Sequence, residues 1–294
     1  MKKKRRLPSL VHIVKQDGRL KILGMGTWHS YWRDPYHLLL TIPWSGFLGL
    51  ITLGYFATNI LFALLYLAGG DCIANARPGS FIDAFFFSVQ TMDTIGYGAM
   101  YPRTFYGNAM VTVEALIGLL GVAMGTGLMF ARFSRPTACV LFSRAAVIAP
   151  FDGVPTLMFR TANQRRNQIL EAQMRVRLVR DEITQEAYFM RRFYDLKLVR
   201  SQNPVFSLTW TVMHPIDEHS PLYGSTPEML AEAETSLVIT LTGIDETVSQ
   251  TIHARHTFVA HELLWNMRFV DIVSRSKDGE RNIDYTRFHD VVPL

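Results

Sequence analysis

The stretch SFIDAFFFSVQTMDTIGYG, Ser80–Gly98, decides the fold of this chain. Its first thirteen residues predict a short apolar helix, because Ser80 can cap the helix and Asp83 lies in the first turn. Such a helix is about 20 Å long, too short to cross the hydrocarbon core of a bilayer. An apolar helix of this length is expected to be re-entrant in a membrane or buried within protein.

Two much longer apolar stretches flank this segment. No charged side chain lies between His37 and Asp71, and only Glu114 lies between Arg103 and Arg132. Each stretch exceeds the roughly 20 residues that a membrane-spanning helix needs, and core helices of this length normally carry a polar face. We therefore predict two spans, from about Ile42 to Ala68 and from Phe105 to Phe133.

Basic residues predict the topology. Residues 1–37 hold nine of the 30 Lys and Arg residues, whereas the loop between the spans holds two. This bias places both termini in the cytoplasm and residues 69–103 outside. Basic residues beside a membrane indicate contact with anionic lipid rather than with nucleic acid. The expected domains are an N-terminal arm with an interfacial helix (1–41), a domain that holds both spans (42–135) and a cytoplasmic domain (136–294).

Thr94-Ile-Gly-Tyr-Gly98 has the pattern of a potassium selectivity filter. Backbone carbonyls that replace the hydration shell of K⁺ can share one axis only where some residues adopt conformations that suit glycine, hence Gly96 and Gly98. We expect potassium ions at Thr94, Ile95, Gly96 and Tyr97, with the Tyr97 ring pointing away from the ions. One chain supplies a quarter of the ring, so we expect a homotetramer.

The sequence beyond residue 145 predicts many short strands separated by turns, which is typical of a β-sandwich. The strand candidates are residues 175–180, 205–212 in part, 236–242 and 268–273. Residues 1–27 are expected to be a loosely ordered arm. No GxGxxG motif follows a predicted strand, so no nucleotide or other organic cofactor is expected.

Further motifs lie outside any generic pore sequence. Together with residues 94–98 they make the chain resemble the prokaryotic inward-rectifier potassium channels over nearly its whole length. The resemblance implies passive K⁺ conduction, an immunoglobulin-like cytoplasmic domain and a multi-pass protein of the bacterial inner membrane. The motifs are Ala84-Phe-Phe-Phe-Ser-Val, Ala131-Arg-Phe-Ser-Arg-Pro136, His214-Pro-Ile-Asp-Glu-His-Ser-Pro-Leu-Tyr223, His253-Ala-Arg-His256 and Asp284-Tyr-Thr-Arg-Phe-His289.

The resemblance also implies two gates. The constriction of the inner helix falls on Phe130, where an apolar ring can close a path by dewetting; a Phe that faces lipid or core is the alternative. The cytoplasmic constriction falls on residues 243–251, with Gly243, Ile244 and Ser249 as candidates. Gly243 and the polar run after it suit a bend that lines water.

The sequence departs from the family pattern in three ways. Val122 is also a candidate gate residue. It occupies the position at which strong rectifiers carry the acid that traps polyamines, so strong rectification is not expected. The animal members of the family carry a basic cluster where this chain has residues 136–139. Phosphoinositide activation of the animal type is therefore not expected. Gln90 and Met100 replace the acid–base pair that supports the filter in animal members.

Two acids near the filter have two interpretations. Asp93 directly precedes the filter at the negative end of the short helix, where an acid is unfavourable unless it is protonated or paired. Asp93 and Glu114 either raise the cation concentration or sense pH at the inner filter mouth, or they are hydrogen-bonded structural acids. Asp245 and Glu246 likewise either line the ion path or take part in turn hydrogen bonds.

Arg132, Arg135 and Arg33 flank the spans and are expected to contact anionic headgroups. Solvated surface arginines are the alternative. No catalytic constellation is apparent, which argues against a membrane-anchored enzyme. A membrane-tethered receptor or scaffold is the other alternative, and the two filter glycines argue against it.

Overall fold

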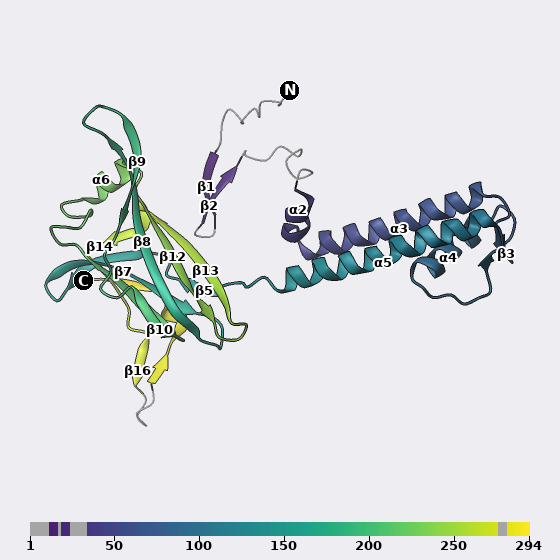
Figure 1. The fold of residues 1–294 in the computed structure, drawn as a ribbon. Coiled ribbons are helices and arrows are strands. Elements are labelled where there is room, and N and C mark those ends of the chain that lie inside the picture. Colours follow the sequence, from purple (N-terminus) through teal and green to yellow (C-terminus); the bar gives the residue numbers. More distant parts are fainter. Residues whose placement is uncertain (1–11, 17–18, 24–33, 276–280) are drawn as a thin grey trace. The chain divides into compact units, whose positions relative to one another are not determined.

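The chain divides into two units (Figure 1). The structure is a computed structural model that describes residues 12–16, 19–23, 34–275 and 281–294. One unit, within residues 26–135, is helical and contains residues 94–98. The other joins residues 136–294 with the hairpin near the N-terminus and is built mainly of strands. Arg33 lies outside the described residues.

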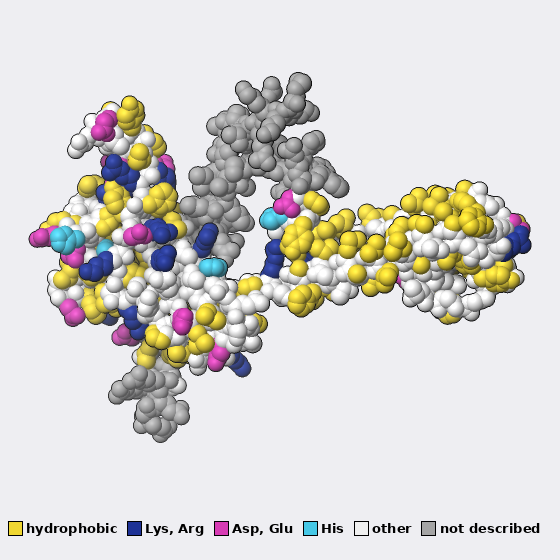
Figure 2. All heavy atoms as spheres, in the orientation of Figure 1, with side chains coloured by type: hydrophobic (Ala, Val, Ile, Leu, Met, Phe, Trp, Pro, Cys, Tyr) yellow, Lys and Arg dark blue, Asp and Glu magenta, His cyan; other side chains and the backbone are white. Residues whose placement is uncertain are grey.

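Two long antiparallel helices, α3 (Trp44–Ala68) and α5 (Phe105–Phe133), form most of the helical unit. With 25 and 29 residues, they are about 38 and 44 Å long, which exceeds the roughly 30 Å of a bilayer core. Large apolar side chains, such as those of Leu53 and Leu119, are exposed along both helices (Figure 2). Two apolar helices of spanning length are thus confirmed.

The first span begins two residues later than expected. Helix α2 (Pro35–Thr41) precedes it, and its C-cap residue, Ile42, has an extended ψ of 151°. Proline disfavours a helical conformation in the residue before it, and Pro43 therefore separates α2 from α3. Helix α2 begins at Pro35, with Asp34 as its N-cap residue, so a short helix precedes the first span. Its expected place at the membrane interface stays a prediction.

A two-stranded ladder joins the two ends of the segment that contains α4 and residues 94–98. Strand β3 (Ile73–Ala74) pairs with β4 (Tyr101–Pro102), so residues 75–100 form a loop with a fixed base. Within this loop α4 (Phe81–Met92) packs against both long helices, and Phe87 and Met92 join Phe62 of α3 in one core. The predicted short apolar helix is therefore confirmed.

The second unit contains two five-stranded sheets. In the first, with order β10-β8-β12-β13, β9 pairs with the other end of β8; the strands are β8 (Ile169–Ile183), β9 (Phe189–Asp195), β10 (Gln202–Phe206), β12 (Ser236–Asp245) and β13 (Gln250–Val259). In the second, with order β11-β7-β6-β14, β5 also pairs with β7; the strands are β5 (Val140–Phe142), β6 (Ala146–Phe151), β7 (Val154–Asn163), β11 (Thr209–Pro215) and β14 (Leu263–Trp265). Only the β6–β14 pairing in these sheets is parallel.

Shorter elements complete the unit. They are α6 (Pro227–Glu232), the 3₁₀ helices Ala260–Glu262 and Tyr285–Arg287, and the strand pairs β1 (His12–Gln16) with β2 (Arg19–Leu23), β15 (Met267–Phe269) with β18 (Val291–Pro293), and β16 (Val273–Arg275) with β17 (Arg281–Ile283). Both large sheets contribute to one core, which includes Phe159 and Trp210 from one sheet and Leu178 and Ile239 from the other. Buried and less buried residues alternate along β12, as a strand with one face in a core requires.

The strand predictions succeed where one strand follows a single period. Residues 175–180 lie in β8 and residues 236–242 in β12. Residues 205–212 are divided at Ser207 and Leu208 between β10 and β11, which belong to different sheets. Residues 268–273 are not one strand either, because β15 ends at Phe269. A local pattern does not record where a chain crosses from one sheet to another.

The N-terminal arm contains more structure than expected. Strands β1 and β2 pair as an antiparallel hairpin, although residues 1–27 were expected to be loosely ordered. The hairpin clusters with the β-rich unit, whereas α2 clusters with the helices. The expected 1–41 segment is thus divided between the two units.

Candidate functional site

Local capping positions the start of α4. The Ser80 hydroxyl accepts a hydrogen bond from the Asp83 N–H at 3.3 Å, as the sequence predicts. Asp83 in turn accepts from the Arg77 backbone N–H and forms an ion pair with the Arg77 guanidinium at 2.8 Å. These contacts fix the loop that leads into α4.

The five residues Thr94–Gly98, termed the 94–98 segment, follow α4 with an alternating backbone. The φ angle is positive at Thr94 (56°), Gly96 (59°) and Gly98 (81°), and it is not positive at Ile95 or Tyr97. Alternation of left- and right-handed conformations turns successive N–H groups to one side and successive C=O groups to the other. The expected left-handed conformation is present at both glycines, and Thr94 adopts it as well.

Side chains of the 94–98 segment are uncovered in the single chain. All five residues are exposed, and the Tyr97 side chain is 76% exposed. The segment is held at its start by backbone hydrogen bonds, from Ile95 N–H to the Gln90 carbonyl at 2.9 Å and from Thr94 N–H to the Thr91 carbonyl at 3.2 Å. One chain therefore fixes the beginning of the segment but leaves its surroundings open.

Behind α4 lies a buried polar cluster around Glu114. The Glu114 carboxylate, on α5, accepts hydrogen bonds from the Tyr66 hydroxyl of α3 at 2.5 Å and from the Ser88 hydroxyl of α4. Asn59 of α3 lies 3.0 Å from the Ser88 hydroxyl and donates to the Tyr55 carbonyl. Glu114, Ser88 and Asn59 are fully buried. This cluster joins all three helices, so the geometry favours the structural interpretation of Glu114 over the pore-electrostatic one.

Asp93, like Glu114, accepts a hydrogen bond from a tyrosine hydroxyl of α3. Its Oδ2 accepts a hydrogen bond from the Tyr55 hydroxyl of α3 at 2.6 Å. The carboxylate is thus directed to a neighbouring helix, as in the alternative of a hydrogen-bonded acid. Asp93 is the C-terminal cap residue of α4 and directly precedes the 94–98 segment.

The predicted gate residues of α5 lie on its exposed surface. Val122 is 66% exposed and Phe130 is 73% exposed. They are eight residues apart, which places them on the same face of a helix. Phe133, one turn beyond Phe130, instead contacts Trp44 of α3 with a ring-centroid distance of 4.8 Å.

Arg132 and Arg135 have partners within the helical unit. Arg132 donates to the carbonyls of Leu39 and Ile42, the latter at 2.7 Å, and its guanidinium carbon lies 4.7 Å from the centroid of the Trp44 ring. Arg135 donates to the Leu40 carbonyl at 3.3 Å. Carbonyls at a helix C-terminus lack intrahelical partners, and these guanidinium groups satisfy them at the end of α2. For Arg132 the geometry thus favours contact with protein over contact with a headgroup.

The expected bend at Gly243 is a bulge within strand β12. The pairing of β12 with β8 shifts register between Thr242 and Ile244, so both Gly243 and Ile244 lie in a sheet rather than in a loop. Gly243 is buried, and a Cβ atom there would lie 2.5 Å from the Ile169 side chain. Close packing against β8 explains this glycine. Ser249, with a φ of 52°, lies in the turn that follows β12.

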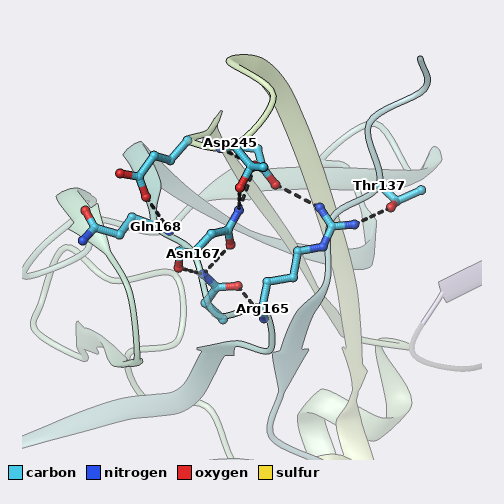
Figure 3. A network of polar contacts seen from close by, with 8 residues as sticks. Thr137, Arg165, Asn167, Gln168 and Asp245 are labelled. Atoms are coloured by element: carbon cyan, nitrogen blue, oxygen red, sulfur yellow. Dashed lines mark hydrogen bonds and ion pairs between the residues drawn. The ribbon is translucent and has the colours of Figure 1, made fainter. Parts of the chain in front are cut away.

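A polar network holds the start of that turn (Figure 3). The Asp245 side chain, 2% exposed, accepts from Arg165 at 2.9 Å, from the Asn167 amide at 2.8 Å and from the Thr247 N–H at 2.9 Å. Arg165 also donates to the Thr137 hydroxyl. Burial on its own raises the pKa of Asp245, but these hydrogen bonds and the Arg165 charge outweigh it and lower the pKa below its usual value. Asp245 is therefore tied into turn hydrogen bonds.

The Glu246 side chain accepts a longer hydrogen bond from the Gln168 N–H, at 3.2 Å, and it is exposed. It does not share the burial of its neighbour Asp245.

Sequence reasoning missed the partners of these acids. Tyr55, Asn59 and Tyr66 interrupt the apolar α3 at spacings of four and seven residues, which places them on one helix face. Polar groups inside a span normally face protein and not lipid, so this stripe was an available signal. Arg165 and Asn167 had no comparable signal, because Asp245 follows about 80 residues later.

Known proteins resemble the chain over nearly its whole length. Residues 140–294 match the family "Inward rectifier potassium channel C-terminal domain", and residues 48–135 match the family "Ion channel". The inward rectifier potassium channel Kirbac3.1 of Paramagnetospirillum magnetotacticum is 52% identical over 280 residues, which cover 95% of each chain. Inward rectifier potassium channel 4 of Rattus norvegicus is 33% identical over 75% of this chain and 52% of its own length.

A human relative is more distant. Inward rectifier potassium channel 18 of Homo sapiens is 29% identical over 88% of this chain and 65% of its own length. Among solved structures, a DNA glycosylase of Pseudomonas fluorescens superimposes with a TM-score of only 0.20 at 12% identity, which is too low to indicate a shared fold. The sequence matches and the two apolar helices with a β-rich domain identify an ion channel rather than an enzyme. This chain belongs to the inward rectifier potassium channel family.

Proposed function

We propose that four copies of this chain surround one axis and conduct K⁺ passively through a filter formed by their 94–98 segments. The alternating φ angles from Thr94 to Gly98 carry this proposal, because they are the backbone feature that aligns consecutive carbonyls. Carbonyls of Thr94, Ile95, Gly96 and Tyr97 then replace the hydration shell of the ion. The exposed side chains of the segment are left for the neighbouring subunits to cover.

In this proposal α4 is the re-entrant pore helix. It has 12 residues and an apolar surface, and its C-terminus leads directly into the filter. The partial negative charge of a helix C-terminus favours a cation there. No organic cofactor and no nucleic acid take part.

The gates are proposed at two levels. Val122 and Phe130 share an exposed face of α5, and a ring of four Phe130 side chains can close an aqueous path by dewetting. The second level is the end of the β12–β13 hairpin, from Gly243 and Ile244 in the last residues of β12 to Ser249 in the turn. The immunoglobulin-like β-domains continue the aqueous path on the cytoplasmic side.

The proposed location is the bacterial inner membrane, with both termini in the cytoplasm. The excess of basic residues before the first span supports this orientation. Along the chain the proposed segments are the N-terminal arm (1–41), the pore domain (42–135) and the cytoplasmic β-domain (136–294), with the β1–β2 hairpin of the arm grouped with the β-rich unit. Anionic headgroups are proposed to bind Arg33, Arg135 and those N–H groups of Arg132 that the α2 carbonyls do not use.

The test is ⁸⁶Rb⁺ uptake into liposomes that contain the purified full-length protein, with Na⁺ and Ba²⁺ as controls. We expect selective uptake that Ba²⁺ blocks and that Gly96→Ala abolishes, because alanine is strained at a φ of 59°. Gly49→Ala is the matched control, since Gly49 lies within α3 and its added methyl group meets open space. Normal uptake by Gly96→Ala, or loss of uptake by Gly49→Ala alone, contradicts the proposed filter.

A further inference from the structure

The hydrogen bond from Tyr55 to Asp93 joins α3, termed the outer helix, to the residue that precedes the proposed filter. We propose that Tyr55 and Asp93 are positioning residues, whose hydrogen bond holds the inner end of the filter in its conducting geometry and thereby maintains ion selectivity. The inference rests on the proposed function of the 94–98 segment. Its basis is the 2.6 Å contact between the Tyr55 hydroxyl and Asp93 Oδ2.

The backbone at this point is held in a costly conformation. Thr94 has a φ of 56°, in the left-handed region that carries an energetic cost for residues with a side chain. Such residues persist only where the surrounding structure restrains them. Within α4, the Gln90 carbonyl lies 2.9 Å from the Ile95 N–H and 3.4 Å from the Gly96 N–H. The Tyr55–Asp93 bond adds a restraint from a second helix, directly beside the strained residue.

The position of Asp93 also requires a partner. Asp93 caps the C-terminal end of α4, where the helix dipole disfavours a negative charge. A hydrogen bond from a hydroxyl group stabilises the carboxylate without adding a positive charge near the ion path. Tyr55 supplies this donor from α3.

This contact is connected to the Glu114 cluster through Asn59, but it holds a different part of α4. Ser88, which contacts Glu114, lies in the middle of α4, whereas Asp93 lies at its end. Asn59, one turn from Tyr55 on α3, approaches the Met92 sulfur at 3.5 Å. The outer helix thus fastens α4 at its middle and at its end, and only the second attachment adjoins the filter.

Substitutions separate positioning from a direct effect of the Asp93 charge on the ions. Tyr55→Phe removes the donor and leaves the carboxylate, so a charge effect predicts wild-type behaviour for this variant. Asp93→Asn removes the charge but keeps an oxygen that can accept the hydrogen bond. Asp93→Ala removes both the charge and the acceptor.

The experiment compares these variants and the double variant Tyr55→Phe/Asp93→Ala in liposomes, by the ratio of ⁸⁶Rb⁺ to Na⁺ uptake and by Ba²⁺ block. We expect Tyr55→Phe and Asp93→Ala each to lower the uptake ratio about tenfold, which corresponds to about 1.4 kcal/mol, in the range of one charge-assisted hydrogen bond. The uptake ratio of the double variant should be no lower than that of either single variant. The uptake ratio of Asp93→Asn should lie between those of the wild type and Asp93→Ala.

The matched control is Tyr106→Phe. The Tyr106 hydroxyl donates to the Leu65 carbonyl of α3 at 3.0 Å, so it also links a helix to the outer helix, but without an acid beside the filter. Its uptake ratio should equal that of the wild type. A wild-type ratio for Tyr55→Phe, or a double variant whose loss is the product of the single losses, overturns the proposal.

Failure of the proposed channel function can be distinguished from failure of the positioning role of Tyr55 and Asp93. If wild-type liposomes take up no Rb⁺ at any pH or lipid composition, the channel proposal fails by itself. The same four variants are then compared by thermal unfolding in detergent. Additive shifts in Tm show that Tyr55 and Asp93 are not coupled and overturn the positioning role as well.

Discussion

The helical unit and the β-rich unit distribute their apolar and polar residues in opposite ways. The helical unit exposes large apolar side chains along α3 and α5 and buries Glu114, Ser88 and Asn59 between its helices. The β-rich unit buries its apolar residues between two sheets and carries charged residues over its surface (Figure 2). The difference shows that each unit is adapted to its own solvent, lipid for the helices and water for the strands.

The acids of the two units also differ in the hydrogen-bond donors that they contact. Glu114 and Asp93 accept hydrogen bonds from neutral hydroxyl groups, whereas Asp245 accepts from the Arg165 guanidinium as well as from amides. In the helical unit, neutral donors satisfy the carboxylates without bringing another charge out of water. In the β-rich unit, Arg165 is partly exposed and keeps part of its hydration.

The largest expected effect separates the buried leucines of the β-rich unit from the exposed leucines of the helical unit. Leu178→Ala, in the sheet core, should lower the free energy of unfolding by about 3 kcal/mol, since it leaves a cavity. Leu119→Ala, at a side chain that is 66% exposed on α5, should change it by less than about 0.5 kcal/mol. Thermal and urea unfolding of the full-length protein in detergent measures both. Equal losses would break the comparison between the two units.

The next effect concerns the acid within the helices. Glu114→Gln should destabilise the protein by about 2 kcal/mol, because an amide cannot accept two strong hydrogen bonds as a carboxylate does and leaves buried polar groups poorly satisfied. The readout is the Tm of the full-length protein in detergent, together with its elution profile in size-exclusion chromatography. Glu246→Gln, at an exposed acid, is the control and should be neutral. An unchanged Tm for Glu114→Gln would mean that the cluster does not join the helices.

The smallest effect is a pH dependence of the turn at Asp245. The folded pKa of Asp245 is lowered, so its ionised form stabilises the folded protein above the unfolded pKa of about 3.9, and this stabilisation is lost as pH falls through the folded pKa. Asp245→Asn should therefore be less stable by about 1 kcal/mol at pH 7, and the difference should shrink below about pH 4.

Hydrogen exchange of peptides that cover residues 163–168 and 245–250 reports this local stability. Asp195→Asn is the control, because Asp195 pairs with Arg177 on an exposed surface where ion pairs contribute little. A difference between Asp245→Asn and wild type that stays constant down to pH 3 would contradict the role assigned to the carboxylate charge.

Sequence reasoning located the main elements but not their connections. Both spans, α4, and the strands at residues 175–180 and 236–242 were predicted, because hydropathy and side-chain period are local properties. The predictions did not give the breaks within residues 205–212 and 268–273, where the chain leaves one strand and starts another. They also placed Gly243 in a bend, because a glycine that allows close packing and one that allows a turn look alike in sequence.

The sequence by itself determined the two spans, the short helix between them, and the two glycines at which the 94–98 segment takes positive φ. These features depend on the chemistry of neighbouring residues. Only the tertiary structure decided the roles of the acids. Tyr55 is 38 residues from Asp93, Tyr66 is 48 residues from Glu114, and Arg165 is 80 residues from Asp245. Such a carboxylate acquires its role from partners that only folding brings within hydrogen-bond distance.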